Sequence, residues 1–176
     1  MQYLEYYQSA NRHLEVCNIM LDALMEMKGK VHLKAKRQSL KLDIYYLSGY
    51  IIETMISYSF FVSLGWKKKE HIETYPLYEM GFKTHKLSAK ILFATSKGHC
   101  DYSGITLLGI KCHDVKEKKM FNEWSEVVRY QNPKTCSKLD FTEVDLQRYL
   151  KDINLMFDQL KKNIIYDKSF QEYRRY

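Results

Sequence analysis

The sequence predicts an all-α protein, an antiparallel up-and-down bundle of four to five helices. The chain has 176 residues but only seven glycines and two prolines, which suits a few long helices better than many short strands. Its apolar side chains recur every three and four residues over long stretches, as the buried face of a helix requires. We expect one domain over residues 1–165, followed by an aromatic and basic tail at 166–176.

An amphipathic first helix is expected from the start of the chain to about Gly29. Its apolar positions alternate four and three residues apart: Tyr3, Tyr7, Ala10, Leu14, Cys17, Leu21 and Leu24. Residues 28–41 then carry six Lys or Arg and no acid. Lys36 and Arg37 in this stretch are candidate phosphate ligands, although a solvated connection and helix start explains the same charges.

Residues 44–66 are the most apolar stretch and carry a single charge, Glu53. Such a run is either a membrane span or the central helix of a core. A carboxylate at mid-bilayer costs about 2.5–3.5 kcal/mol, and several hydroxyl side chains dilute the hydrophobicity, so we expect a core helix. Gly49 and Ser57, four residues before and after Glu53, form a lane of small residues beside it. Glu53 is either a core acid satisfied by a base or a functional acid between helices.

A loop with one turn of helix is expected after Trp66, because the sequence there lacks a period and contains Pro76 and Gly81. Thr84 then caps a third helix that ends at Gly98. We expect His85, which opens this helix, to cap or pack rather than to catalyse.

Two further helices complete the expected bundle. Asp114 caps the fourth, which runs to about Arg129 and Tyr130, because Pro133 follows and disfavours helical backbone before it. The fifth begins with a capping box at residues 142–145 and has a sustained apolar face to residue 164.

The net charge of +7 suggests an acidic partner, most simply nucleic acid or a nucleotide. Residues 1–16 carry charges where a signal peptide needs an apolar run, and the four cysteines are widely spaced, so we expect a cytoplasmic protein with free thiols and no membrane association. The pairs His99–Cys100 and Cys112–His113 contain zinc-type ligands, but neither has the usual ligand spacing. We therefore expect no metal or cofactor.

Three segments together resemble the HEPN domains of prokaryotic nucleotidyltransferase-associated and toxin-antitoxin systems. They are YLSGYIIETMISY at 46–58, THKL at 84–87 and FNEWSEVVRYQNP at 121–133. The resemblance implies an antiparallel helical bundle, a homodimer, and either a metal-independent ribonuclease or a partner of a small nucleotidyltransferase or an antitoxin.

The catalytic signature of that family is an Arg followed, after four to six residues, by a His. Arg129 matches the Arg, but the matching positions hold Lys134, Thr135 and Cys136. The group that would transfer the proton is missing from them, so the resemblance does not carry nuclease activity over to this chain.

The function expected from the sequence is therefore non-catalytic binding of RNA or a nucleotide phosphate. Besides Lys36 and Arg37, its candidate ligands are Arg129, Tyr130, Lys134 and Glu53. We also expect Glu53 and Arg129 to form a partly buried pair. The alternatives are a protein-interaction module and a divergent metal-independent ribonuclease that uses Arg129 with an atypical base.

Overall fold

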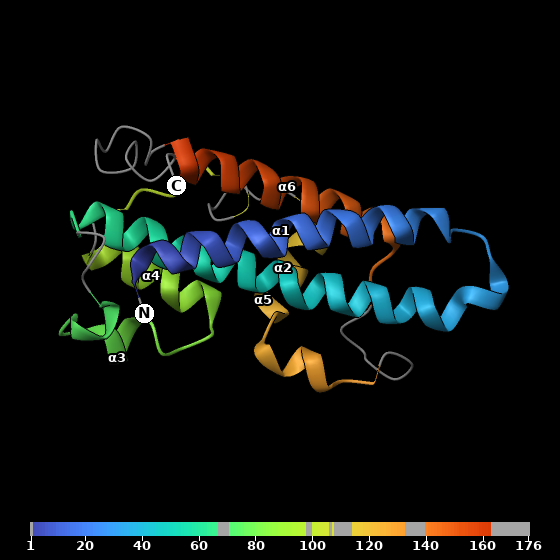
Figure 1. Ribbon diagram of the computed structural model, residues 1–176, viewed down its shortest axis with the longest axis horizontal. Helices are drawn as coiled ribbons and strands as arrows, with labels where there is room; N and C mark the ends of the chain where they lie inside the picture. Colours follow the sequence, from blue (N-terminus) through green and yellow to red (C-terminus); the bar gives the residue numbers. More distant parts are fainter. Residues whose placement is uncertain are drawn as a thin grey trace.

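The computed structural model describes residues 2–66, 71–97, 100–105, 107, 114–132 and 140–162 (Figure 1). Within these residues the protein is all-helical and contains no strand, which confirms the predicted class. The α-helices are α1 (Tyr3–Glu26), α2 (Lys34–Ser63), α3 (Tyr78–Gly81), α4 (Leu87–Lys97), α5 (Val115–Glu123) and α6 (Glu143–Lys162). Short 3-10 helices are η1 (Val31–Leu33), η2 (Ile72–Thr74) and η3 (Glu126–Tyr130). The expected tail at 166–176 lies outside the described residues.

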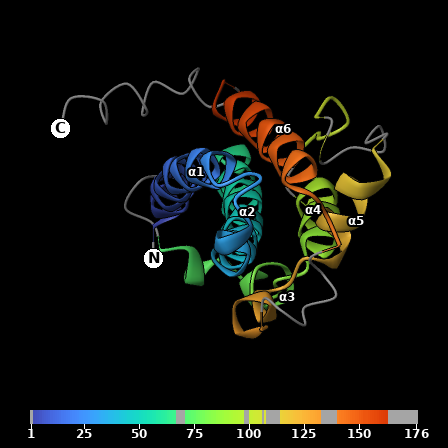
Figure 2. The ribbon, with the colours of Figure 1, turned by 90° about the vertical axis from the view of Figure 1, so that its right-hand side faces the viewer.

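Three long helices run side by side along the molecule (Figure 1). The helices α1 and α2 form an antiparallel hairpin, and its turn contains Gly29 at φ +80°, a left-handed conformation that glycine adopts without steric cost. The third, α6, packs against both α1 and α2. Viewed along the long axis, α2 lies between α1 and α4 (Figure 2). Contacts with α1, α4, α6 and η3 therefore surround α2.

The centre of α2 is the core of the molecule. Every residue from Ile51 to Tyr58 is buried, including Glu53, which is 8% exposed. Neighbouring helices pack around this stretch, as expected for the predicted core helix. No helix in the described ranges combines the length and hydropathy needed to cross a membrane.

The start signals predicted for α5 and α6 are confirmed. The Asp114 side chain accepts hydrogen bonds from the first backbone amides of α5. Before α6, the Thr142 N–H donates to Asp145 Oδ2 at 2.8 Å, while Asp145 N–H donates back to Thr142 Oγ1 at 3.2 Å. The helix expected to start directly after Thr84 begins instead at Leu87, and Thr84 Oγ1 accepts a hydrogen bond from Lys86 N–H in the turn before it.

The predicted fourth helix, however, does not run on to Tyr130. Its α-helical part ends at Glu123, and extended backbone at Trp124 and Ser125 leads into η3. The cause is a tertiary contact, because Trp124 turns its indole onto α2 and donates from Nε1 to the carbonyl of Tyr46 at 3.0 Å. This break places the η3 residues against α2.

Candidate functional site

A buried carboxylate lies at the centre of the candidate site. Both oxygens of Glu53, on α2, are 3.1 Å from Nδ1 of His85, which precedes α4. The Nζ of Lys90, on α4, lies 3.3 Å from Glu53 Oε1. One acid is thus shared by two basic groups, and the acid and the lysine are both buried.

Lys90 is buried more completely than any other charged side chain among the described residues, at 1% exposure. Its ammonium donates to the carbonyl of Phe82 at 2.7 Å and lies 5.1 Å from the centre of the Phe82 ring. Burial lowers the pKa of Lys90, and the Glu53 carboxylate opposes that shift. Lys90 therefore provides the positive charge that a buried carboxylate requires.

Two tyrosines continue the site along α2. Tyr46, Tyr50 and Glu53 are spaced four and three residues apart and so share one face of the helix. The Tyr50 ring lies 6.3 Å from the His85 ring, 5.3 Å from the Trp124 ring and 5.0 Å from the Tyr46 ring. Burial and a hydrogen bond with Tyr46 raise the pKa of Tyr50, so its hydroxyl stays protonated.

Arg129, on η3, lies at the other end of this tyrosine pair. Its Nη1 donates to the Tyr46 hydroxyl at 3.4 Å, its Nη2 donates to the Tyr130 hydroxyl, and its guanidinium lies 4.5 Å from the centre of the Tyr130 ring. Both Arg129 and Tyr130 are exposed, the latter at 72%. We call Tyr46, Tyr50, His85, Arg129 and Tyr130 the Arg–Tyr surface.

The predicted pair between Glu53 and Arg129 is wrong. Glu53 bonds to Lys90 and His85 instead, whereas Arg129 bonds to tyrosines. The lane of small residues beside Glu53 does let a side chain from another segment approach α2, but that side chain is Trp124. A Cβ added at Gly49 would lie 1.9 Å from Trp124 Cε2. The indole fills the space that we expected an arginine to enter.

The other predicted ligands are not gathered at this surface. Arg37 lies 16 residues before Glu53, about 24 Å along α2, and its Nη2 donates to Glu143 Oε1 at 2.5 Å. It lines a separate cavity of about 230 Å³ with Lys34, Lys41 and Glu143. Lys36 is exposed on the same end of α2, and Lys134 lies outside the described residues.

A cavity of about 370 Å³ adjoins the Arg–Tyr surface. One wall consists of Lys86, Leu87 and Ser88, which directly follow His85. The other includes Trp124 and Ser125, which directly precede η3, together with Phe121, Asn122 and Glu123. The cavity therefore lies between the segments that carry His85 and Arg129.

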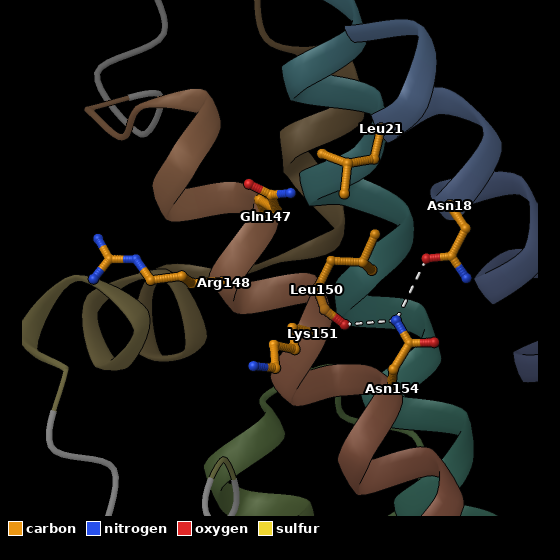
Figure 3. A pocket seen from close by; sticks show the side chains of 7 residues that line it. All are labelled: Asn18, Leu21, Gln147, Arg148, Leu150, Lys151 and Asn154. Atoms are coloured by element: carbon orange, nitrogen blue, oxygen red, sulfur yellow. Dashed lines mark hydrogen bonds between the residues drawn. The ribbon is translucent and has the colours of Figure 1, made fainter. Parts of the chain in front are cut away.

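A second cavity, of about 430 Å³, lies between α1 and α6 (Figure 3). Several of its polar side chains are paired within the protein: Asn154 Nδ2 donates to the Leu150 carbonyl and to Asn18 Oδ1, and Arg148 binds Asp114 and Asp145.

Lys90 is a site residue that the sequence analysis missed, and His85 was expected only to cap or pack. A signal for Lys90 existed, because it lies three residues after Leu87 and four before Ala94, within the apolar stripe of its helix. Nothing local could link His85 to Glu53, since 32 residues separate them.

The two His–Cys pairs, which we did not expect to bind zinc, lie mostly outside the described residues. His99, Cys112 and His113 lie outside them, and Cys100 Sγ donates to Ser63 Oγ at 3.4 Å. Across the described part of the chain, no three His, Cys, Asp or Glu side chains are grouped as metal ligands.

Comparison with known proteins finds no match: no family, no characterised protein and no solved structure is significantly similar to the chain. The residues of the site therefore carry the functional argument.

Proposed function

We propose that the protein binds RNA or a nucleotide through phosphate and base contacts on the Arg–Tyr surface. The observation that carries this proposal is the exposed guanidinium of Arg129, which is oriented by Tyr46 and Tyr130. No carboxylate among the described residues contacts it, so its charge is available to an anion.

The chemistry of this surface suits a nucleotide. A guanidinium presents a planar fork of donors that matches the oxygens of a phosphate. An exposed tyrosine ring such as that of Tyr130 offers a stacking face for a base, and such stacking tolerates any sequence. The net charge of +7 favours a polyanion over a neutral ligand.

The fold that we propose for this function is an up-and-down bundle of the HEPN type. The long antiparallel α1–α2 hairpin, α6 beside it, and the packing of η3 on α2 support this proposal. We also propose that the protein is a cytoplasmic homodimer that belongs to a toxin-antitoxin system.

Titration of a labelled single-stranded RNA at several salt concentrations tests the binding. We expect the affinity to fall by about 0.7 log unit per log unit of salt for each phosphate neutralised, and Arg129→Gln to weaken binding and reduce this slope. Lys151→Gln is the matched control, since Lys151 is exposed on α6. Undetectable binding at about 50 mM salt would refute the proposal.

A protein-interaction module is the second candidate function. Two neighbours of Arg129 on η3 favour it, because Val127 is 50% exposed and Tyr130 72% exposed. Such a module would dock on a nucleotidyltransferase or an antitoxin through η3. It would show the same weak RNA binding with and without Arg129.

A further inference from the structure

We infer that the cavity of about 370 Å³ between the start of α4 and the end of α5 binds a small zwitterion that carries an apolar group. An apolar α-amino acid is the simplest molecule of this class. The cavity adjoins the Arg–Tyr surface but is lined by none of its residues. The inference therefore adds a second ligand site and does not rest on the proposed binding of RNA.

The first support is the charge on the two walls of the cavity. Lys86, directly before α4, provides a cation on one wall, and Glu123, the last residue of α5, provides an anion on the other. Both residues are exposed, and although both lie in the described part of the chain, no ion pair joins them. A molecule in the cavity thus finds a partner for a carboxylate at one wall and a partner for an ammonium group at the other.

The second support is the apolar part of the lining. Leu87, Phe121 and Trp124 line the cavity and are themselves buried, at 3%, 9% and 4% exposure. An aliphatic or aromatic group that packs against them leaves water, which favours binding. Ser88 and Asn122 add polar groups at the edge of this apolar surface. A mostly apolar lining with a few polar groups is typical of small-molecule sites, and the volume lies at the lower end of their range.

The third support is that both walls are anchored to α2. Trp124 Nε1 donates to the Tyr46 carbonyl at 3.0 Å, and Gly49 leaves room for the indole against the helix. On the other wall, Lys90 of α4 lies 3.3 Å from the buried carboxylate of Glu53. The cavity is therefore largely formed before a ligand enters, which reduces the entropy lost on binding.

The balance of charge distinguishes this ligand from a nucleotide. The lining contains one lysine and one glutamate, whereas the whole chain has a net charge of +7. A phosphate in the cavity would lie close to the Glu123 carboxylate as well as to Lys86, and like charges brought together oppose binding. A nucleobase also has no ammonium group for Glu123. The cavity therefore favours a ligand with both signs of charge.

Calorimetric titration of the full chain with leucine and two analogues tests the class of ligand. Isoamylamine is leucine without its carboxylate, and isocaproate is leucine without its ammonium group. We expect leucine to bind about 5-fold or more tightly than either analogue, because each analogue leaves one charged wall without a partner. Glycine, a zwitterion without an apolar group, should bind about 10-fold or more weakly than leucine.

Two variants assign the charges to the walls. Lys86→Gln should weaken the binding of leucine and isocaproate about 5-fold or more and leave the affinity for isoamylamine little changed. Glu123→Gln should instead weaken the binding of leucine and isoamylamine and spare isocaproate. A loss of structure would weaken all three ligands alike in both variants. Lys97→Gln, at an exposed lysine at the end of α4 outside the cavity, is the matched control and should bind leucine like the wild type.

Trp124 reports where the ligand binds. The chain has two tryptophans, and Trp66 packs on Phe61 and Tyr75 and does not line the cavity. In Trp66→Phe, Trp124 is the only tryptophan, so leucine should change its fluorescence with the dissociation constant that calorimetry measures. Binding of leucine without a change in this fluorescence would contradict the proposed location.

Three results would overturn the inference. The first is no binding of leucine, methionine or phenylalanine by the wild type at up to about 10 mM. The second is equal affinity for leucine and its two singly charged analogues. The third is a response of Trp124 fluorescence to adenosine monophosphate at lower concentration than to any of these amino acids, which would assign the cavity to a nucleotide.

Discussion

Glu53 and Lys90 place two opposite charges in the core of one small protein. Removal of a charged group from water is costly, and the mutual attraction offsets that cost only while both partners are present. The geometry supplies further compensation, because the Phe82 carbonyl also accepts from Lys90 and the His85 ring also meets Glu53. The local structure therefore requires both charges to be present, although the pair adds little net stability.

A double-mutant cycle on the free energy of unfolding should show this dependence. We expect Glu53→Gln or Lys90→Met alone to cost about 3–5 kcal/mol, because each strands the other charge, and the double variant to cost less than the sum. Denaturant unfolding gives the four free energies. A parallel cycle of Glu53→Gln with Arg129→Met should be additive within about 0.3–0.5 kcal/mol, since these residues do not pair.

Gly49 is the residue that lets Trp124 approach α2. A methyl group there would overlap the indole ring, which has little freedom to move while Nε1 is bonded to Tyr46. We expect Gly49→Ala to destabilise the protein by about 1–3 kcal/mol and to shift its tryptophan fluorescence. Gly104→Ala is the control, because a Cβ there meets nothing within 4 Å. Equal stability of the two variants would contradict the proposed packing.

At the scale of elements, the contact between α5 and α6 is electrostatic. Burial tends to raise the pKa of Asp145, but hydrogen bonds from Thr142, Lys116 and Arg148 outweigh this effect and lower it. Burial also raises the pKa of Glu117 to about 7, and the carboxylates of Asp152 and Asp114 add to the rise while Arg148 opposes it. At this interface Asp145 is thus held ionised, whereas the raised pKa of Glu117 favours its protonated form.

These shifts predict how stability changes with pH. A raised pKa means that folded Glu117 binds a proton more tightly than the unfolded chain, so its contribution to stability declines between about pH 4.5 and pH 7. Glu117→Gln should therefore raise the melting temperature relative to the wild type at pH 8, with the difference shrinking at pH 5. Thermal unfolding at both pH values measures this, and a difference independent of pH would contradict the shift.

The elements that the sequence predicts well are those whose signals are local. The apolar stripe of α1, the buried run in α2 and the capping residues Asp114 and Thr142 all depend on neighbours a few residues away. The break after Glu123 depends instead on a hydrogen bond across 78 residues, from Trp124 to Tyr46. The site is hard to predict for the same reason, because tertiary packing decides which basic residues pair with Glu53.

At the scale of the whole molecule, exposed apolar side chains favour a dimer. On α1, Val16 is 38% and Ile19 69% exposed, and on α6, Val144 is 44% and Leu155 50% exposed. The groove between these two helices is lined by Asn18 and Asn154, which directly precede Ile19 and Leu155 in the sequence (Figure 3). Such a face can continue the core across a two-fold axis.

Light scattering after size exclusion tests the proposed homodimer. We expect a species of twice the 21.1 kDa chain mass, and Ile19→Lys together with Leu155→Lys to convert it to a monomer. Val115→Lys, at an exposed apolar residue of α5, is the control that should leave the mass unchanged. A wild-type species at the mass of one chain at micromolar concentration would exclude the dimer.

Because α5 ends at Glu123, the two parts of the site lie on different kinds of backbone, the buried α2 helix and the short exposed η3 segment. The Glu53 amide lies inside an eight-residue buried run of α2, so we expect it to exchange with solvent mainly through global unfolding. The η3 segment is five residues long and mostly exposed, so its amides exchange through small local openings. If a ligand binds Arg129 as we propose, it would order the exposed η3 segment against the buried α2 helix, and part of its binding free energy would offset the conformational entropy that η3 loses.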